Sequence, residues 1–153
     1  MNHPTGDTMT EAYNDRKIER VEAFKQHLKL VNAPAGSLHH VHPSTTHLTL
    51  VASVGLPSGL LPTIEEIPIG KGLAGLAWAQ RSVVSSCDLM HDPKVGQKAK
   101  PLPFESSYAI PVFENGLVTA VLGVAFEQSM VLTPEMLKTL SILPPALSTA
   151  PTQ

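Results

Sequence analysis

The most constraining feature of the sequence is an Asn-Gly pair, Asn115-Gly116, between two β-rich runs. The runs cover residues 107–114 and 117–127. Asn-Gly is the preferred two-residue connection of an antiparallel hairpin, because both turn positions need a positive φ. The second run contains LVTAVLGVAF, which is apolar on both faces and indicates a strand that is covered on both sides. We therefore expect an antiparallel sheet with this strand in a central position.

Two further strands are predicted at residues 37–42 and 47–55, on either side of a turn at residues 43–46. In the second of them apolar residues alternate with more polar ones, and the apolar set is Leu48, Leu50, Ala52 and Val54. Successive side chains point to opposite faces of a strand, so this alternation predicts one apolar face. Residues 83–87 form a short β-branched run and are predicted as another strand.

The first predicted helix covers residues 10–31 and carries one apolar stripe. The stripe consists of Ile18, Val21, Phe24, Leu28 and Val31. The stripe could pack on the chain's own sheet. Part of it also follows a heptad rhythm, so it could instead meet a second copy of the chain. The second alternative makes Val21, Phe24, Leu28 and Val31 the candidate dimer interface.

Two shorter helices are predicted further along the chain. One follows Gly70-Lys-Gly72 and contains LAGLAWAQR. The other begins at Thr133-Pro134-Glu135, where an N-cap, a first-turn proline and an acid come in order, and it ends by Pro144-Pro145. Before the first of these helices, residues 55–69 contain three prolines and two glycines and are predicted as an ordered loop with at most one short helical turn.

The length of 153 residues corresponds to one domain, which we expect at residues 10–148, with a disordered lead-in at 1–9 and a disordered tail at 149–153. The net charge of -2 argues against a nucleic-acid partner. No segment approaches the ~20 apolar residues that span a bilayer, so no membrane partner and a cytoplasmic location are expected. The single cysteine, Cys87, excludes an intramolecular disulfide and every CxxC motif.

Together these segments resemble the GAF domain family over about residues 15–145. The resemblance rests on Gly70-Lys-Gly72-Leu-Ala-Gly75 before a helix, the strand that leads to Asp92-Pro93, and the hairpin from Pro111 to Gly116. It implies an α+β fold, GAF/PAS-like, with a central antiparallel sheet of five to six strands and helices on both faces. It also implies a small-molecule pocket on one face and helices that pair between subunits on the other.

Some relatives in this family reduce free methionine sulfoxide, and they need a nucleophilic and a resolving cysteine. This sequence has only Cys87. Those enzymes also place acids on the hairpin strands, and the matching positions here are Ser107 and Gly123 or Ala125. A lone thiol would need an external reductant to complete a catalytic cycle. The sequence also lacks the Asn-Lys-Phe-Asp-Glu signature of cyclic-nucleotide domains, and Cys87 with His91 matches a bilin attachment site only weakly.

Four histidines lie within nine residues: His39, His40, His42 and His47. His40 and His42 share a strand face and could offer two imidazoles to a metal, with His47 as a third ligand, while His39 points the other way. Exposed histidines at a hairpin end are the simpler interpretation. We therefore expect no metal and no cofactor.

The candidate ligand pocket lies under the long segment that follows residue 88, because this segment carries apolar side chains and must cover one sheet face. The candidate ligand-binding residues are Trp78, Ser85, Cys87, Met90, His91, Val95, Phe104, Ser106 and Tyr108. Trp78, Met90 and Phe104 are alternatively plain core residues. The resulting hypothesis is a dimeric, non-catalytic sensor domain in signal transduction that binds a small metabolite. The alternatives are a divergent free methionine-(R)-sulfoxide reductase that uses Cys87, and a purely structural dimerisation module.

Overall fold

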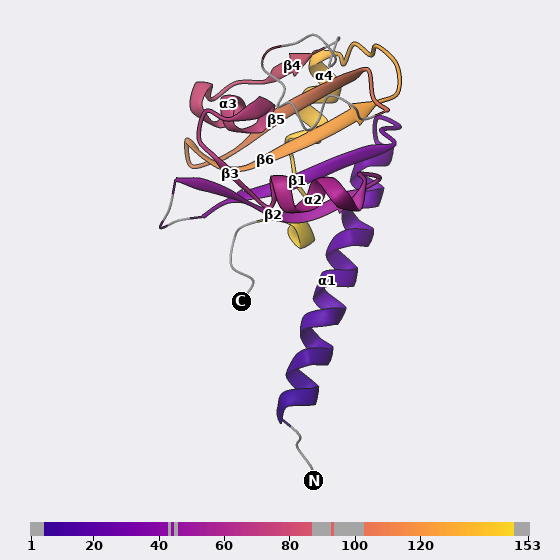
Figure 1. Ribbon diagram of the computed structural model, residues 1–153, viewed down its shortest axis with the longest axis vertical. Coiled ribbons are helices and arrows are strands. Elements are labelled where there is room, and N and C mark those ends of the chain that lie inside the picture. The colour runs from indigo at the N-terminus through magenta and orange to yellow at the C-terminus, as the bar shows by residue number, and fades with distance from the viewer. Residues whose placement is uncertain (1–4, 43, 45, 87–92, 94–102, 149–153) are drawn as a thin grey trace.

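The computed structural model describes residues 5–42, 44, 46–86, 93 and 103–148, and its centre is one six-stranded sheet (Figure 1). The strands are β1 Ala35–Val41, β2 His47–Val54, β3 Glu66–Pro68, β4 Val84–Ser86, β5 Ser106–Glu114 and β6 Leu117–Phe126. Their order across the sheet is β3-β2-β1-β6-β5-β4, and each neighbouring pair is antiparallel. This arrangement confirms the predicted α+β class with a central antiparallel sheet.

The β5–β6 hairpin forms as the Asn-Gly pair predicts. Asn115 has a φ of 53° and Gly116 a φ of 79°, which are the positive values that a two-residue hairpin turn requires. β6 lies between β1 and β5, so it is covered by a strand on each side. The hairpin also contains a β-bulge at Thr119, because Val112 pairs with Ala120 and the next residue pairs with Val118.

A second bulge corrects the predicted face of β2. Leu38 pairs with Ala52 and His39 pairs with Leu50, so Val51 is an extra residue in β2. The bulge divides the apolar set between two cores: Ala52 packs in one hydrophobic cluster and Leu48 in the other. The prediction of a single apolar face was therefore wrong, since an extra residue reverses the face of every side chain beyond it.

The helices are α1 Thr5–Lys29, α2 Leu61–Ile64, α3 Gly72–Gln80 and α4 Pro134–Leu140, with short 3-10 helices η1 Ser58–Leu60 and η3 Pro145–Leu147. α1 begins at Thr5, earlier than the predicted Thr10, so the helix takes in part of the expected lead-in. α4 begins as predicted, because the Thr133 hydroxyl accepts a hydrogen bond from the Met136 amide at 3.1 Å. None of the helices in the described chain is long and apolar enough to cross a membrane.

One face of the sheet packs against the C-terminal half of α1 and against α4 and η3. Phe24, Leu28 and Val31 of the α1 stripe are buried in this cluster, together with Leu140 and Leu147 from the C-terminal segment. The sheet contributes alternate residues of its central strands. They are Leu38, Ala52, Tyr108, Ile110, Val112, Ala120, Leu122, Val124 and Phe126.

The other face packs against α3. Leu48, Ala109 and Val121 of the sheet are buried there with Ala77 of α3, and Trp78 is half-buried at the margin of the same cluster. The segment from Ser58 to Pro68, which was predicted as a loop, contributes η1, α2 and the edge strand β3. The sheet therefore has two cores, and the two faces carry different side chains.

Candidate functional site

Small side chains line the centre of the sheet face that α3 covers. Ser37 pairs with Gly123, which pairs with Ala109, so these three form one row across β1, β6 and β5. The next row joins Ala35, Ala125 and Ser107. Paired residues on neighbouring strands project from the same face. We call these six residues the small-residue floor; none of them is charged.

Few atoms of the described residues lie near the position that a side chain at Gly123 would take. A Cβ placed on Gly123 would lie 3.0 Å from the Ser37 hydroxyl oxygen, and the next nearest atom is the Ser37 carbonyl oxygen at 3.7 Å. Only the movable hydroxyl of Ser37 therefore approaches this position closely. Ser107 donates its hydroxyl proton to the Val124 carbonyl at 2.9 Å, which fixes its side chain.

Apolar side chains form walls around the floor. Phe104, Leu56 and Leu73 pack against Ala35 and Ala125. Leu73 and Trp78 both belong to α3, and both pack against the hydrophobic cluster on this face of the sheet. The structure therefore brings the predicted ligand residues Trp78 and Phe104 to one face of the sheet. An apolar wall above a floor with a few hydroxyl groups is typical of a small-molecule site.

His39 stands on the same face, one row from Ser37. It is 1% exposed, and its Nε2 lies 2.7 Å from the carbonyl oxygen of Ile64. A carbonyl oxygen only accepts, so Nε2 carries the hydrogen. Burial lowers the pKa of His39, with a smaller effect from the nearby His40, and the ring is therefore neutral. Nδ1 is then a bare acceptor, and it is buried without a partner among the described residues, as is the hydroxyl of Thr119.

Three histidines perform the same structural task. The Nε2 atoms of His27 and His40 lie 2.8 Å and 2.9 Å from the carbonyl oxygens of Leu140 and Leu147. Leu140, Leu147 and Ile64 are the last residues of α4, η3 and α2. The final carbonyls of a helix have no partner within the helix, so each histidine satisfies one of them. Sequence reasoning missed this role because the partners are far away along the chain.

The histidine-rich segment does not form a metal centre in the described chain. His39 and His40 point to opposite faces, as predicted, and each holds a carbonyl. His42 is exposed, and its Nδ1 accepts hydrogen bonds from the amide and hydroxyl of Ser44 at 3.3 Å and 3.1 Å. Across the described residues, no three His, Cys, Asp or Glu side chains are placed to hold one ion.

Several predicted ligand residues lie away from the floor. The Tyr108 hydroxyl donates to the Met130 carbonyl at 2.7 Å and accepts from the Leu132 amide at 3.1 Å, in the core on the α1 side. Ser106 is fully buried and donates to the Gln128 carbonyl at 2.7 Å. Ser85 is exposed and pairs with Tyr108. These three residues therefore do not join Trp78 and Phe104. Four further candidates lie outside the described residues, namely Cys87, Met90, His91 and Val95.

Most residues of the predicted dimer stripe are buried against the rest of the same chain. Phe24, Leu28 and Val31 are 0%, 2% and 4% exposed and pack on the chain's own sheet, while Val21 is half-buried. These three residues therefore pack within the chain, which was one of the two predicted alternatives, because buried side chains have no surface left for a second subunit.

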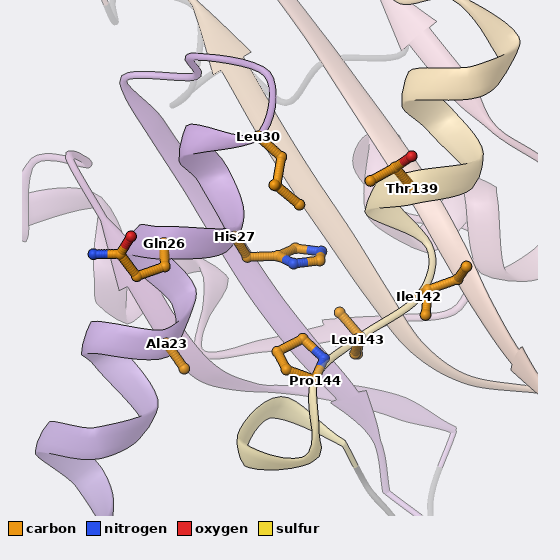
Figure 2. Close-up of a pocket in the computed structure, with 8 residues that line it drawn as sticks. All are labelled: Ala23, Gln26, His27, Leu30, Thr139, Ile142, Leu143 and Pro144. Carbon is orange, nitrogen blue, oxygen red and sulfur yellow. The ribbon is translucent and has the colours of Figure 1, made fainter.

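A groove lies beside α1 (Figure 2). This groove has a volume of about 580 Å³ and is lined by Ala23, Gln26, His27, Leu30, Thr139, Ile142, Leu143 and Pro144. Leu30 and Ile142, on its opposite sides, are 54% and 64% exposed. Neither residue belongs to the predicted stripe, so sequence periodicity did not indicate this surface.

Solved structures share this fold. The GAF domain of a phosphoenolpyruvate-protein phosphotransferase from Coxiella burnetii is 19% identical, with a TM-score of 0.69 over 89% of this chain and 85% of that chain. The type II free methionine-R-sulfoxide reductase of Thermoplasma acidophilum is 19% identical, with a TM-score of 0.64 over 82% and 87%. The free methionine-R-sulfoxide reductase of Neisseria meningitidis, in complex with its substrate, is 20% identical, with a TM-score of 0.64 over 82% and 75%.

A comparison with curated proteins gave no match. The sequence profile of the GAF domain, however, matches residues 21–150, which is most of the chain. This match agrees with the order of strands and with the helices on both faces. The chain therefore belongs to the GAF domain family.

Proposed function

We propose that this chain is a regulatory GAF domain of the cytoplasm that binds a small metabolite on the small-residue floor and acts as a homodimer without catalysis. The observation that carries the proposal is the floor itself: it consists of two rows of Ala, Ser and Gly residues, and the apolar Phe104, Leu56 and Leu73 pack against its members Ala35 and Ala125. No member of the floor is an acid, a base or a thiol. Such a surface can bind and orient a ligand. The reactive groups that it carries are the hydroxyls of Ser37 and Ser107, and Ser107 donates its proton to a backbone carbonyl.

The long first helix supports a dimer. The C-terminal half of α1 packs on the sheet, whereas its N-terminal half extends away from the rest of the described chain (Figure 1). A helical segment of fewer than about 12–15 residues is marginally stable in water when nothing packs against it. A second subunit would supply that packing. The exposed Leu30 and Ile142, which line the groove beside α1, add apolar surface that a second subunit could cover.

β1 offers a short physical route from the floor to α1. Ser37 lies in the floor, and its neighbour Gly36 faces the other side. A Cβ placed on Gly36 would lie 2.8 Å from Cδ2 of Leu28 and 3.3 Å from the ring of Phe24, so α1 rests directly on this strand. A ligand that favours one position of β1 would therefore bias the packing of α1, provided that its affinity differs between the two arrangements.

Native mass spectrometry of the gently purified protein tests the proposal, because it reports subunit number and any retained small molecule together. A dimer that carries an additional small mass supports it. A monomer without additional mass contradicts it. A dimer without additional mass favours the structural dimerisation module.

Free methionine-(R)-sulfoxide reduction is the second candidate, favoured by the two reductases of the same fold. In this reaction methionine sulfoxide and two thiols give methionine, a disulfide and water. Cys87 would supply one thiol and an added dithiol the reducing equivalents. The places where the resemblance implies substrate-holding acids are occupied by Ser107, Gly123 and Ala125, which weakens this candidate.

An assay with free methionine-(R)-sulfoxide and dithiothreitol decides this candidate. Turnover in the wild type that disappears in Cys87→Ser would establish the enzyme and replace the sensor proposal. Absence of turnover in the wild type would exclude the reductase as a function of this chain.

A further inference from the structure

His27, His39 and His40 each bind the last carbonyl of a helix through Nε2, and they differ in the surroundings of the other ring nitrogen, Nδ1. In each of them Nε2 donates its hydrogen to a carbonyl oxygen. Burial lowers the pKa of His39, so its ring is neutral and its Nδ1 is an acceptor. Of these three Nδ1 atoms, that of His39 is the one that is buried without a hydrogen-bond partner among the described residues. A buried polar atom without a hydrogen bond costs on the order of 1–3 kcal/mol, so native structures rarely retain one that nothing satisfies.

His39 lies next to the small-residue floor on the same face of the sheet. His39 pairs with Val121, and Ser37 pairs with Gly123, so the two rows are adjacent on one face of β1 and β6. Among the described residues, a Cβ placed on Gly123 would approach atoms of Ser37 alone within 4 Å, at 3.0 Å and 3.7 Å. Ile64, at the end of α2, holds the far side of the imidazole through Nε2. The ring therefore has one fixed edge and one free acceptor.

The chemistry of the site restricts the ligand. The free atom accepts, so the ligand must present an N–H or O–H group. The floor carries no charge, and an ionised group on such a surface would lose its hydration without gaining a counter-charge. Apolar walls at Phe104, Leu56 and Leu73 favour a ligand with some carbon surface.

We propose that Nδ1 of His39 accepts a hydrogen bond from the N–H or O–H group of a small, uncharged ligand bound on the small-residue floor. This proposal rests on the proposed sensor function and names the polar contact of that site. His39 thus has two partners, the Ile64 carbonyl on one edge and the ligand on the other.

The test uses the full chain labelled with ¹⁵N-histidine and follows both nitrogens of each ring by NMR. The probes are acetamide, propionamide and isobutyramide, which have N–H donors, and their N,N-dimethyl forms, which have none. Fragments of this size bind weakly, so the titration extends to about 100 mM. We expect the primary amides to shift the Nδ1 resonance of His39 in a saturable manner and the dimethyl forms to leave it unchanged. The Nδ1 resonance of His40 serves as the internal reference.

Two variants separate ligand contact from folding. His39→Gln keeps an N–H near the position of Nε2 and removes the Nδ1 acceptor, and His40→Gln makes the same change on the opposite face. We expect His39→Gln to weaken amide binding about tenfold, the size of one hydrogen bond. His40→Gln should bind the amides as the wild type does.

The proposal is overturned if no primary amide shifts Nδ1 of His39, or if the dimethyl forms shift it equally. An unchanged resonance is the result expected of a histidine whose second nitrogen holds only a buried water. A dimer that retains a small mass in native mass spectrometry, but whose His39 does not respond, would leave the sensor function standing and remove this contact alone.

Discussion

His39 and His40 are neighbours in β1, and they hold the ends of two helices on opposite faces of the sheet. His39 binds the carbonyl of Ile64 at 2.7 Å, and His40 binds the carbonyl of Leu147 at 2.9 Å. The two bonds connect β1 to residues 25 and 107 positions away. Because side chains alternate along a strand, one dipeptide fastens α2 to the α3 side and η3 to the α1 side.

The first prediction concerns pH. Burial lowers the pKa of both His39 and His40 below the ordinary 6.5 in the folded chain. Below pH 6.5 the unfolded chain binds protons that the folded chain does not, so the free energy of unfolding should fall as the pH falls. Urea unfolding between pH 7.5 and 5 measures this slope. In a His39→Gln, His40→Gln double variant the slope should be smaller; an identical slope would show that these rings do not contribute to it.

The second prediction compares two glycines on opposite faces. In Gly36→Ala the new Cβ would lie 2.6 Å from the carbonyl oxygen of Gly123 and 2.8 Å from Leu28, so we expect a loss of more than about 2 kcal/mol. In Gly123→Ala the new methyl meets only the movable Ser37 hydroxyl, at 3.0 Å, among the closest atoms. It should change stability by less than about 1 kcal/mol.

The same pair also tests the floor. Gly123→Ala should abolish retention of the small mass in native mass spectrometry, because its methyl group fills the open position beside Ser37. Retention of that mass by Gly123→Ala, at wild-type stability, would place the ligand elsewhere.

The third prediction assigns Tyr108 to structure. Its hydroxyl donates to Met130 and accepts from Leu132, and Tyr108→Phe leaves both groups without this partner. We expect a loss of about 1–3 kcal/mol in the free energy of unfolding and unchanged ligand retention. Chemical denaturation and native mass spectrometry give the two readouts. Loss of the ligand without loss of stability would return Tyr108 to the binding site.

The fourth prediction concerns the α1 stripe. Phe24 is 0% exposed, so Phe24→Ala should cost about 3–5 kcal/mol through the cavity that it leaves. Ile18, on the same helix, is 62% exposed, and Ile18→Ala should change stability by less than about 0.5 kcal/mol. The midpoints of thermal unfolding report the difference. Equal effects of the two substitutions would contradict the packing described for α1.

The fifth prediction tests the proposed dimer surface. Leu30→Asp and Ile142→Asp put charges beside the groove, where both side chains are exposed, so the fold should tolerate them. We expect the double variant to be monomeric by light scattering at concentrations where the wild type is dimeric. Val131→Asp is the matched control, since Val131 is 77% exposed and does not line the groove. Dimers that survive the double variant and dissociate in the control would reverse the assignment.

Local chemistry in the sequence was enough to predict much of the fold. The Asn115-Gly116 turn and the Thr133 cap depend on interactions within a few residues, and both form as predicted. β3 was missed because it is a three-residue edge strand inside a Pro-rich segment, and its pairing depends on β2 rather than on its own pattern. The bulge at Val51 was missed because an extra residue leaves the apolar alternation of the sequence intact.

The candidate site was only partly predictable, because the register of the strands determines which face of the sheet each side chain points to. Trp78 and Phe104 lie on the α3 side of the sheet, whereas Ser106 and Tyr108 point to the α1 side. Phe104 precedes β5, so its side chain does not follow the alternation of that strand. The floor itself consists of Ala, Ser and Gly, which give no periodic signal in a sequence. His39 was predicted only to point away from His40.

The edges of the sheet decide how this chain can associate with others. β3 and β4 are three residues each, β3 ends in Pro68, and Pro111 occupies the stretch of β5 that β4 does not reach. A proline has no N–H to offer, and short edge strands are poor templates for pairing with another chain. Growth of the sheet by strand addition is therefore discouraged at both ends. If copies of this chain associate, we therefore expect the contact to use helices and side-chain surfaces rather than strand pairing.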